Sequence, residues 1–153
     1  MRKSLQRIAL PCAIAALFLL GNSLYGAASP LAQNAAAAKG LLDMAFNQKQ
    51  VAAAFDRYVG ATYTQHNPIA PDGRAAAISL LSGFVAKNSI HYDIIRVIAE
   101  GNLVAVHSHV TFSADDRGNA VVDIFRFEHG KIVEHWDVVQ PVPEKSANSN
   151  TMF

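Results

Sequence analysis

Cysteine is almost absent from this chain, and the single one, Cys12, lies close to the N-terminus. If that segment is removed on export, the remaining protein contains no thiol. Disulfide bonds, a cysteine nucleophile and thiolate zinc sites are then all excluded. The folded protein must therefore be stabilised by its hydrophobic core alone.

The chain also lacks an excess of charge of either sign, with 13 basic and 12 acidic residues. Removing Arg2, Lys3 and Arg7 with an N-terminal signal leaves 10 basic residues against 12 acidic ones. Nucleic acids and anionic membrane surfaces attract strongly basic proteins. The charge balance therefore argues against either of them as the main partner.

No apolar run reaches the roughly 20 residues that a transmembrane helix needs. The longest run, Ile8–Leu20, follows a basic start and precedes the small residues Gly26, Ala27 and Ala28. This order is typical of a secretory signal peptide. We therefore expect residues 1–28 to be a signal peptide. After its cleavage, the protein is expected to be periplasmic or secreted, without stable membrane insertion. The alternative is an uncleaved N-terminal anchor.

Motifs for covalent catalysis or phosphate binding are missing as well. The chain has no nucleophile elbow, no glycine-rich phosphate loop and no Cys-x-x-Cys pair. The chemically active residues that the sequence does offer include aspartate, histidine, asparagine and tyrosine. These side chains suit proton transfer.

The hydrophobic pattern changes from helical to strand periodicity near residue 89. Residues 29–40 are rich in alanine and read as a linker that feeds a helix, and residues 144–153 form a polar tail. About 125 residues remain after the signal, which is enough for one domain, expected at residues 41–143. The pattern predicts helical segments around Leu41–Phe46, Val51–Tyr58 and Arg74–Lys87, a loop or short extended segment at Thr62–Pro71, and strands at Ile90–Ala99, Leu103–Phe112, Val121–Phe127 and Lys131–Val139. This order indicates an α+β fold, with a curved antiparallel sheet wrapped around about three N-terminal helices.

The last two predicted strands form an unusually polar hairpin. Glu128-His129-Gly130 suits a type I turn followed by a G1 bulge. That turn would place Asp123 opposite His135 and put one set of side chains on a single face. The members of this set are Asp123, Phe125, Val133, His135 and Asp137. Carboxylates and an imidazole are costly to bury without a function, so we expect this face to line a pocket.

Two other groups of polar residues are candidates for the same pocket. His107 and His109 share one face of their strand, and Tyr63, His66 and Asn67 lie in the proline-bounded segment after the second helix. Structural alternatives remain open: Asp123 could only pair with His135, and His66 and Asn67 could only cap the loop. A further alternative is a metal site formed by His66, His107, His109 and Asp137.

Several of these segments together resemble the SnoaL-like polyketide cyclase family of the nuclear transport factor two-like superfamily. The segments are YTQHNP, DGRAA, RVIAEGNLVAVHSHV and DIFRFEHGKIVEHWDVVQPVP. The resemblance extends from about Leu41 to Pro143. It implies a cone-shaped α+β barrel that often dimerises through its sheet.

The resemblance also implies an activity: ring closure by intramolecular aldol condensation, without a metal or any other cofactor. Asp137 matches the aspartate that removes the proton next to a carbonyl, while His107 and His109 would polarise the substrate oxygen or position Asp137. His66, Asn67 and Tyr63 would bind substrate, with Asp123, Phe125 and His135 beside them. Related epoxide hydrolases have an arginine and an aspartate where this chain has His107 and His109, so their water activation is not expected.

We therefore expect an exported enzyme that uses general acid–base catalysis on a small apolar carbonyl compound. Because antibiotic-pathway cyclases are not expected to carry an export signal, the alternative is a non-catalytic protein that binds a small molecule in the same pocket.

Overall fold

The computed structural model describes residues 28–153, and the expected signal peptide lies almost wholly outside the described residues. The elements, in chain order, are α1 (Pro30–Leu42), a π-helical turn η1 (Asp43–Asn47), α2 (Val51–Tyr58), β1 (Val59–Gln65), α3 (Arg74–Lys87), β2 (His91–Glu100), β3 (Leu103–Thr111), β4 (Asn119–Glu128) and β5 (Lys131–Pro141). Within this part of the chain, no helix is long and apolar enough to span a membrane.

Residues 29–40 are not a linker, because most of them form α1. Ser29 caps this helix by accepting a hydrogen bond from the backbone N–H of Ala32, and Pro30 occupies the first turn, where proline is tolerated. Alanine favours helix, and its small side chain lets the helix pack closely on the sheet. The low-complexity segment that suggested a linker is therefore a helix with a face of small residues, in which Ala38 is fully buried.

The end of the first helical segment is attached to the sheet by a side chain. The amide of Asn47 in η1 donates to the backbone carbonyl of Tyr92 and accepts from its backbone N–H, at 3.0 and 2.8 Å. The ring of Phe46 stacks on the ring of Tyr92, with the ring centroids 4.5 Å apart. These contacts fix Tyr92 of β2 beneath the helices.

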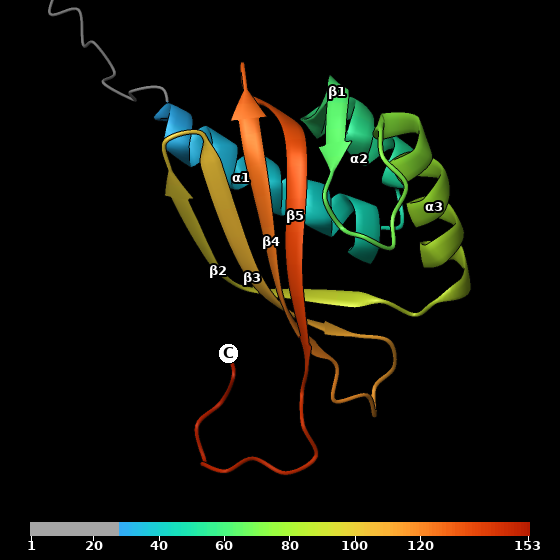
Figure 1. Cartoon of the computed structure of the whole chain (residues 1–153), viewed down its shortest axis with the longest axis vertical. Helices are drawn as coiled ribbons and strands as arrows, with labels where there is room; N and C mark the ends of the chain where they lie inside the picture. The colour runs from blue at the N-terminus through green and yellow to red at the C-terminus, as the bar shows by residue number, and fades with distance from the viewer. Residues whose placement is uncertain (1–27) are drawn as a thin grey trace, which may run out of the picture.

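The five strands form one mixed sheet in the order β1-β5-β4-β3-β2 (Figure 1). The four C-terminal strands are antiparallel, as expected, but β1 pairs with β5 in parallel. The expectation of a purely antiparallel sheet is therefore wrong at this edge. Thr62–Gln65 belongs to β1, and only the residues that follow it form a loop. The α+β curved sheet with three helices is confirmed.

The β4–β5 hairpin differs from the predicted register. His129 and Gly130 both have positive φ, 49° and 72°, as in the two-residue type I′ turn that joins Glu128 to Lys131. An irregularity follows, because Phe127 pairs with Ile132 and Arg126 with Glu134, which leaves Val133 as the extra residue. Asp123 consequently pairs with Asp137, and His135 pairs with Phe125.

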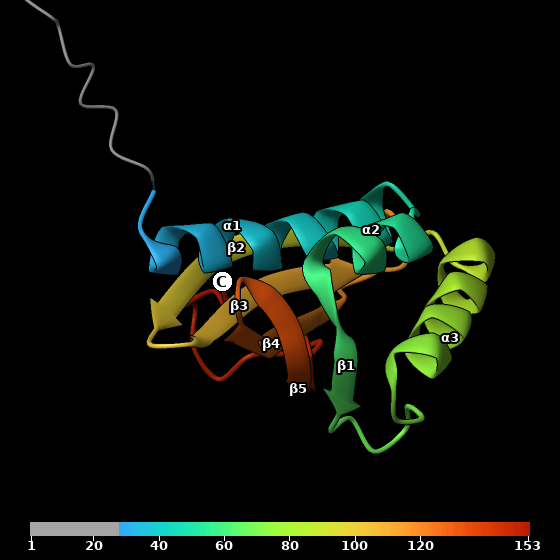
Figure 2. The same cartoon turned by 90° about the horizontal axis from the view of Figure 1, so that it is seen from above.

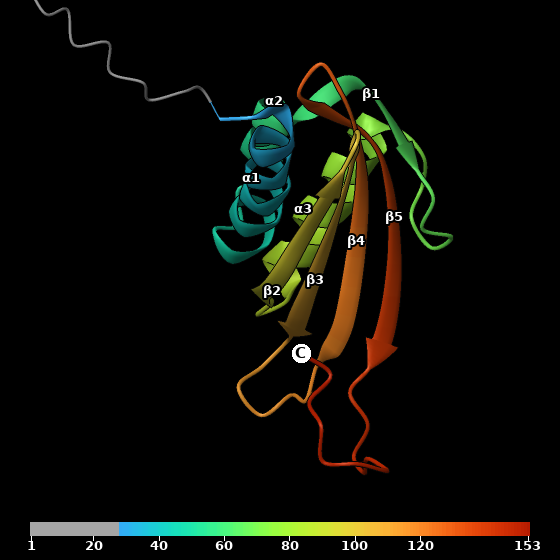
Figure 3. The same cartoon turned by 90° about the vertical axis from the view of Figure 1, so that its left-hand side faces the viewer.

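The helices and the sheet enclose the hydrophobic core. Figures 2 and 3 show α1 and α2 along one side of the strands, and Figure 2 shows α3 beyond β1. Side chains of the sheet alternate between this inner face and an outer face. On β3, for example, Val104, Val106, Ser108 and Val110 are buried, whereas Ala105, His107 and His109 are partly exposed.

Candidate active site

A cavity of about 360 Å³ lies between the helices and the inner face of the sheet. Its size falls within the usual range for pockets that bind small molecules. Most of its wall is apolar and comes from α1, α3 and the sheet. The polar residues of the wall are Tyr63, Gln65, Asn67, Tyr92, Asn119, Asp123, His135 and Asp137.

Asp137 of β5 is held in this cavity by the loop that follows β1. The Asn67 Nδ2 atom donates to both carboxylate oxygens of Asp137, at 2.9 and 2.7 Å. The other amide atom of Asn67, Oδ1, accepts from the backbone N–H of Ile69 at 2.9 Å. Because a backbone N–H can only donate, this second contact fixes which end of the amide faces Asp137. Asn67 and Asp137 therefore lie side by side in the cavity wall, and the predicted role of Asn67 in substrate binding stays a prediction.

His135 links Asp123 to Gln65. Its Nε2 atom lies 3.0 Å from Asp123 Oδ1, and its Nδ1 atom lies 3.0 Å from Gln65 Oε1. Gln65 Oε1 also accepts from the backbone N–H of Asn67 at 2.9 Å, so this atom must be the amide oxygen. The Nδ1 proton of His135 therefore points to Gln65. Any further proton on the pair lies between Nε2 and Asp123 Oδ1.

Asp123 is the most deeply buried carboxyl group of the site, with a relative exposure of 3%. Burial raises the pKa of Asp123, its contacts with His135 oppose this rise, and the charge of Asp137 adds to it. The second carboxyl oxygen, Oδ2, is buried and has no hydrogen-bond partner. An unpartnered buried oxygen is rare in folded proteins and calls for an explanation.

Tyr63 contributes a hydroxyl group that remains protonated. Its oxygen accepts a hydrogen bond from Gln65 Nε2 at 3.2 Å, which leaves its own proton free to donate. Burial and the charges of Asp123 and Asp137 raise the pKa of Tyr63 well above its ordinary value. Tyr63 is therefore a hydrogen-bond donor in the cavity.

The prediction that His107 and His109 share a cavity with Asp137 is wrong. Val106 of β3 pairs with Asp123 on the inner face, so the neighbouring His107 and its i+2 partner His109 face outward. His107 Nδ1 lies 2.6 Å from the guanidinium of Arg96, and His109 Nε2 donates to the carbonyl of Arg117 at 2.8 Å. The ring of Phe153, at the end of the tail, packs against both imidazoles.

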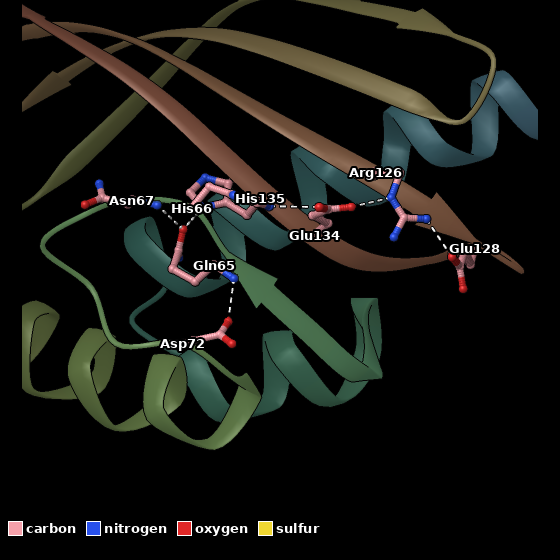
Figure 4. A network of polar contacts seen from close by, with 8 residues as sticks. All are labelled: Gln65, His66, Asn67, Asp72, Arg126, Glu128, Glu134 and His135. Carbon is pink, nitrogen blue, oxygen red and sulfur yellow. Dashed lines mark hydrogen bonds and ion pairs between the residues drawn. The ribbon is translucent and has the colours of Figure 1, made fainter.

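His66 also faces away from the cavity, contrary to its predicted role in substrate binding. Its ring stacks on Trp136 with the ring centroids 4.6 Å apart, and its Nε2 atom lies 2.8 Å from Glu134 Oε1. Figure 4 shows Glu134 continuing this outer network to Arg126 and Glu128. The same figure shows Asp72 bonded to the backbone of Gln65, which anchors the loop on its other side.

The metal ligands considered from the sequence do not converge, because three of the four lie on the outer face. A different group, Asp123, His135 and Asp137, has one possible ligand atom from each residue within 4.8 Å of one another. His135 and Asp137 already have protein partners in this arrangement. The carboxyl groups and the imidazole of these three residues can take up and release protons without a metal ion.

Gln65 and Tyr92 also line the cavity but were not among the predicted site residues. Gln65 contacts Tyr63, Asn67 and His135, so it organises the polar side of the cavity. Had Tyr63–Asn67 been read as extended, its alternation would have placed Tyr63, Gln65 and Asn67 together and His66 on the opposite face. The alternation that identifies Gln65 as a pocket residue was therefore present in the sequence. For Tyr92 no motif offered a comparable signal.

The sequence model of the family described as the SnoaL-like domain matches residues 38–135, which is more than half of the chain. The chain belongs to this SnoaL-like family. The match ends two residues before Asp137. No curated protein matches the chain.

Solved structures with the SnoaL-like fold support this assignment. One is a proposed SnoaL-like polyketide cyclase from Jannaschia sp. CCS1, with 18% identity and a TM-score of 0.62 over 74% of this chain and 90% of that one. Another is a proposed ketosteroid isomerase from Kribbella flavida, with 17% identity and a TM-score of 0.61 over 76% and 84%. A third is an epoxide hydrolase from M. tuberculosis, with 17% identity and a TM-score of 0.61 over 73% and 86%. At these identities the likeness shows the SnoaL-like fold alone.

Proposed function

We propose that this protein is a cofactor-independent enzyme that moves protons on a small, largely apolar carbonyl compound. One observation carries the proposal: the carboxylate of Asp137 lies in an apolar cavity, oriented by two contacts from Asn67 Nδ2. A carboxylate held in this way can remove the proton next to a carbonyl group. The polyketide cyclase and ketosteroid isomerase names of two similar structures agree with carbonyl chemistry.

When Asp137 removes the proton next to the carbonyl group, negative charge develops on the carbonyl oxygen of the substrate. The hydroxyl of Tyr63 can donate a hydrogen bond to that oxygen, because its own oxygen is already bonded to Gln65. Such a donor stabilises an enolate in a cavity from which water is excluded. Tyr63 thus takes the role that the family resemblance implied for His107 and His109.

The reaction is completed when Asp137 returns its proton. Delivery to a different carbon gives an isomerase, and delivery to the alkoxide formed by an internal aldol addition gives a cyclase. Both outcomes conserve all atoms and need no external electron donor. A proton shared by His135 Nε2 and Asp123 Oδ1 would lie in the same cavity and provide a second acidic group.

The second candidate function is a non-catalytic protein that binds a small molecule. It is favoured by the predominantly apolar wall, which would hold a ligand whether or not a reaction follows. This alternative makes no demand on the basicity of Asp137, so one substitution separates the two functions.

The experiment is hydrogen exchange next to a carbonyl group. A panel of small ketones and any ligand retained through purification are incubated with the protein in deuterated buffer, and deuterium incorporation is followed by NMR. We expect Asp137→Asn to lower the exchange rate about 10²–10⁴-fold while ligand affinity is retained. The matched control is Asp93→Asn, the same change at an exposed carboxylate of β2.

If the wild-type protein binds a carbonyl ligand without catalysing exchange, the enzyme proposal is wrong and the binding function stands. Equal exchange rates for the wild type and Asp137→Asn would instead exclude Asp137 as the base.

Export and dimerisation belong to the same proposal. The N-terminal signal pattern supports export. Sequencing the N-terminus of the mature protein would test this, because cleavage removes the first residues of the chain.

On the outer face, four side chains form a continuous apolar row across four strands: Ile98, Ala105, Ile124 and Trp136. This row supports a dimer formed through the sheet, and light scattering measures its mass directly.

A further inference from the structure

Large apolar side chains are exposed around the mouth of the cavity. Half of the large apolar side chains that are exposed in the described part of the chain also belong to the cavity wall. We call these four residues the apolar rim: Ile69, Leu80, Phe84 and Val139. Single exposed apolar residues are ordinary on a protein surface, but a group of them beside a pocket indicates that another molecule binds there.

Two neighbouring strands lead from the buried polar groups of the cavity to the apolar rim. β1 and β5 run in the same direction (Figure 1). From β1 into the loop that follows it, the relative exposure rises from 7% at Tyr63 to 89% at Ile69. On β5 it rises from 9% at His135 to 52% at Val139. Asp137 lies midway between the last two residues, so it is nearer to the mouth than Tyr63 is.

This order of groups fixes how a carbonyl compound lies in the cavity. In the proposed reaction the oxygen accepts a hydrogen bond from Tyr63, and the carbon that loses its proton is next to Asp137. Phe55 is 1% exposed and packs edge-on against Tyr63, with the ring centroids 5.5 Å apart, so it fills the space behind the hydroxyl. A chain attached to the reacting carbon is therefore directed past Asp137 toward the apolar rim.

The apolar rim suits an apolar chain, because its side chains offer no hydrogen-bonding group. Leu80 and Phe84 are four residues apart on α3, so their side chains lie on the same face of the helix. The ring of Phe84 packs edge-on against Phe112, with the ring centroids 6.0 Å apart, which holds it at the mouth. A chain that covers these side chains is itself removed from water. Each methylene that becomes fully buried raises the affinity about fourfold.

We propose that the apolar rim is an outer subsite for the apolar chain of the substrate, which leaves the cavity between α3 and the loop after β1. This inference rests on the proposed function for the position of the carbonyl group. It narrows the substrate to a carbonyl compound with an extended apolar chain on the side of the carbon that loses its proton. Ile69 and Leu80 then set the specificity for chain length and take no part in the chemistry.

A series of methyl ketones tests the proposal: 2-butanone, 2-hexanone, 2-octanone and 2-decanone. Their binding to the full protein is measured by calorimetry. We expect the affinity to rise at least about twofold for each methylene as the chain crosses the rim, because the rim covers only one side of the chain. An affinity that stops rising between 2-hexanone and 2-decanone overturns the proposal.

Ile69→Ser and Leu80→Ser identify the residues responsible. Each variant should lower the affinity for 2-decanone at least about threefold and change that for 2-butanone less than about 1.5-fold, because only the longer chain reaches the rim. The matched control is Leu31→Ser, which should leave both affinities unchanged. Leu31 and Leu80 are helical leucines that are 42% and 43% exposed, but Leu31 is not part of the cavity wall. Equal losses for both ketones, or no loss, overturn the proposal.

Two other occupants of the rim, a second copy of the chain and a membrane surface, give different results. Light scattering measures the mass of the wild type and of Ile69→Ser, and flotation with phosphatidylcholine vesicles measures membrane binding. A dimer or a vesicle complex that Ile69→Ser abolishes overturns the proposal. An unchanged mass and the absence of vesicle binding support it.

These outcomes can be distinguished from those of the proposed reaction. Affinity that depends on chain length and on the rim, without hydrogen exchange, supports the outer subsite and contradicts the enzyme function. Hydrogen exchange without any effect of the rim on affinity does the reverse.

Discussion

His135 on the inner face of the sheet and His109 on the outer face have the same side chain, yet their surroundings have little in common. His135 is buried and joins Gln65 to Asp123 in the cavity wall. His109 is partly exposed, bonds to a loop carbonyl and packs on Phe153 of the tail. The difference teaches that the face of the strand, and not the residue type, decides which polar side chains can act together.

The largest expected difference between the two faces is in stability. Phe125 of the inner face is 2% exposed, whereas Ile98 of the outer face is 64% exposed. We expect Phe125→Ala to lower the free energy of unfolding by about 3–5 kcal/mol, because it leaves a cavity in the core. Ile98→Ala should change it by less than about 0.5 kcal/mol. Urea unfolding of the monomer measures both, and similar losses would contradict the assignment of the faces.

A smaller difference is expected in the proton-exchange activity. His135→Gln removes the imidazole that holds Asp123, so we expect the exchange rate to fall about 10²-fold. His109→Gln, the same substitution on the outer face, should leave the rate within about twofold of the wild type. NMR of deuterium incorporation compares the two variants. If His109→Gln is the more damaging change, the outer face participates in the reaction.

The smallest expected effect is a difference in the pH dependence of stability between two acidic residues. Burial raises the pKa of Asp123, so the native state holds this proton more tightly than the unfolded chain. Its contribution to stability is therefore lost as the pH rises from about 3.9 through the folded-state pKa. On the outer face, hydrogen bonds from Arg126 and His66 lower the pKa of Glu134. Its contribution is present above about 4.3 and is lost as the pH falls.

Asp123→Asn and Glu134→Gln should therefore change the slope of Tm against pH in opposite directions. Thermal unfolding at a series of pH values measures this, with Asp93→Asn as the exposed control. Slopes that change in the same direction would show that one of the two environments is wrongly assigned.

Much of the fold could be predicted because its elements have strong local patterns. The bounds of α3 were predicted correctly, since Gly73 and Asn88 flank a continuous apolar helix. The edge strand β1 was harder to recognise, because its pairing with β5 is non-local and two prolines follow it closely. Alanine-rich α1 was taken for a linker because composition does not show what a segment packs against.

The position of a residue on the cavity wall could be predicted from strand phase in the hairpin and from the polar segment after the second helix. Six predicted residues line the cavity: Tyr63, Asn67, Asp123, Phe125, His135 and Asp137. His107 and His109 were placed on the wrong face because an isolated strand does not show which of its two faces is covered. Val104, Val106 and Val110 on the opposite face were the better guide, since the more apolar face is the one that packs on the core.

The extra residue Val133 in β5 has a consequence for how the hairpin tolerates changes in length. If Val133 were paired regularly, every later side chain of the strand would change faces, so His135 and Asp137 would leave the cavity and Trp136 would enter it. An insertion of one residue between His135 and Asp137 would likewise turn Asp137 outward while leaving every original side chain in the sequence. In this hairpin, the number of residues determines chemistry as firmly as their identity does.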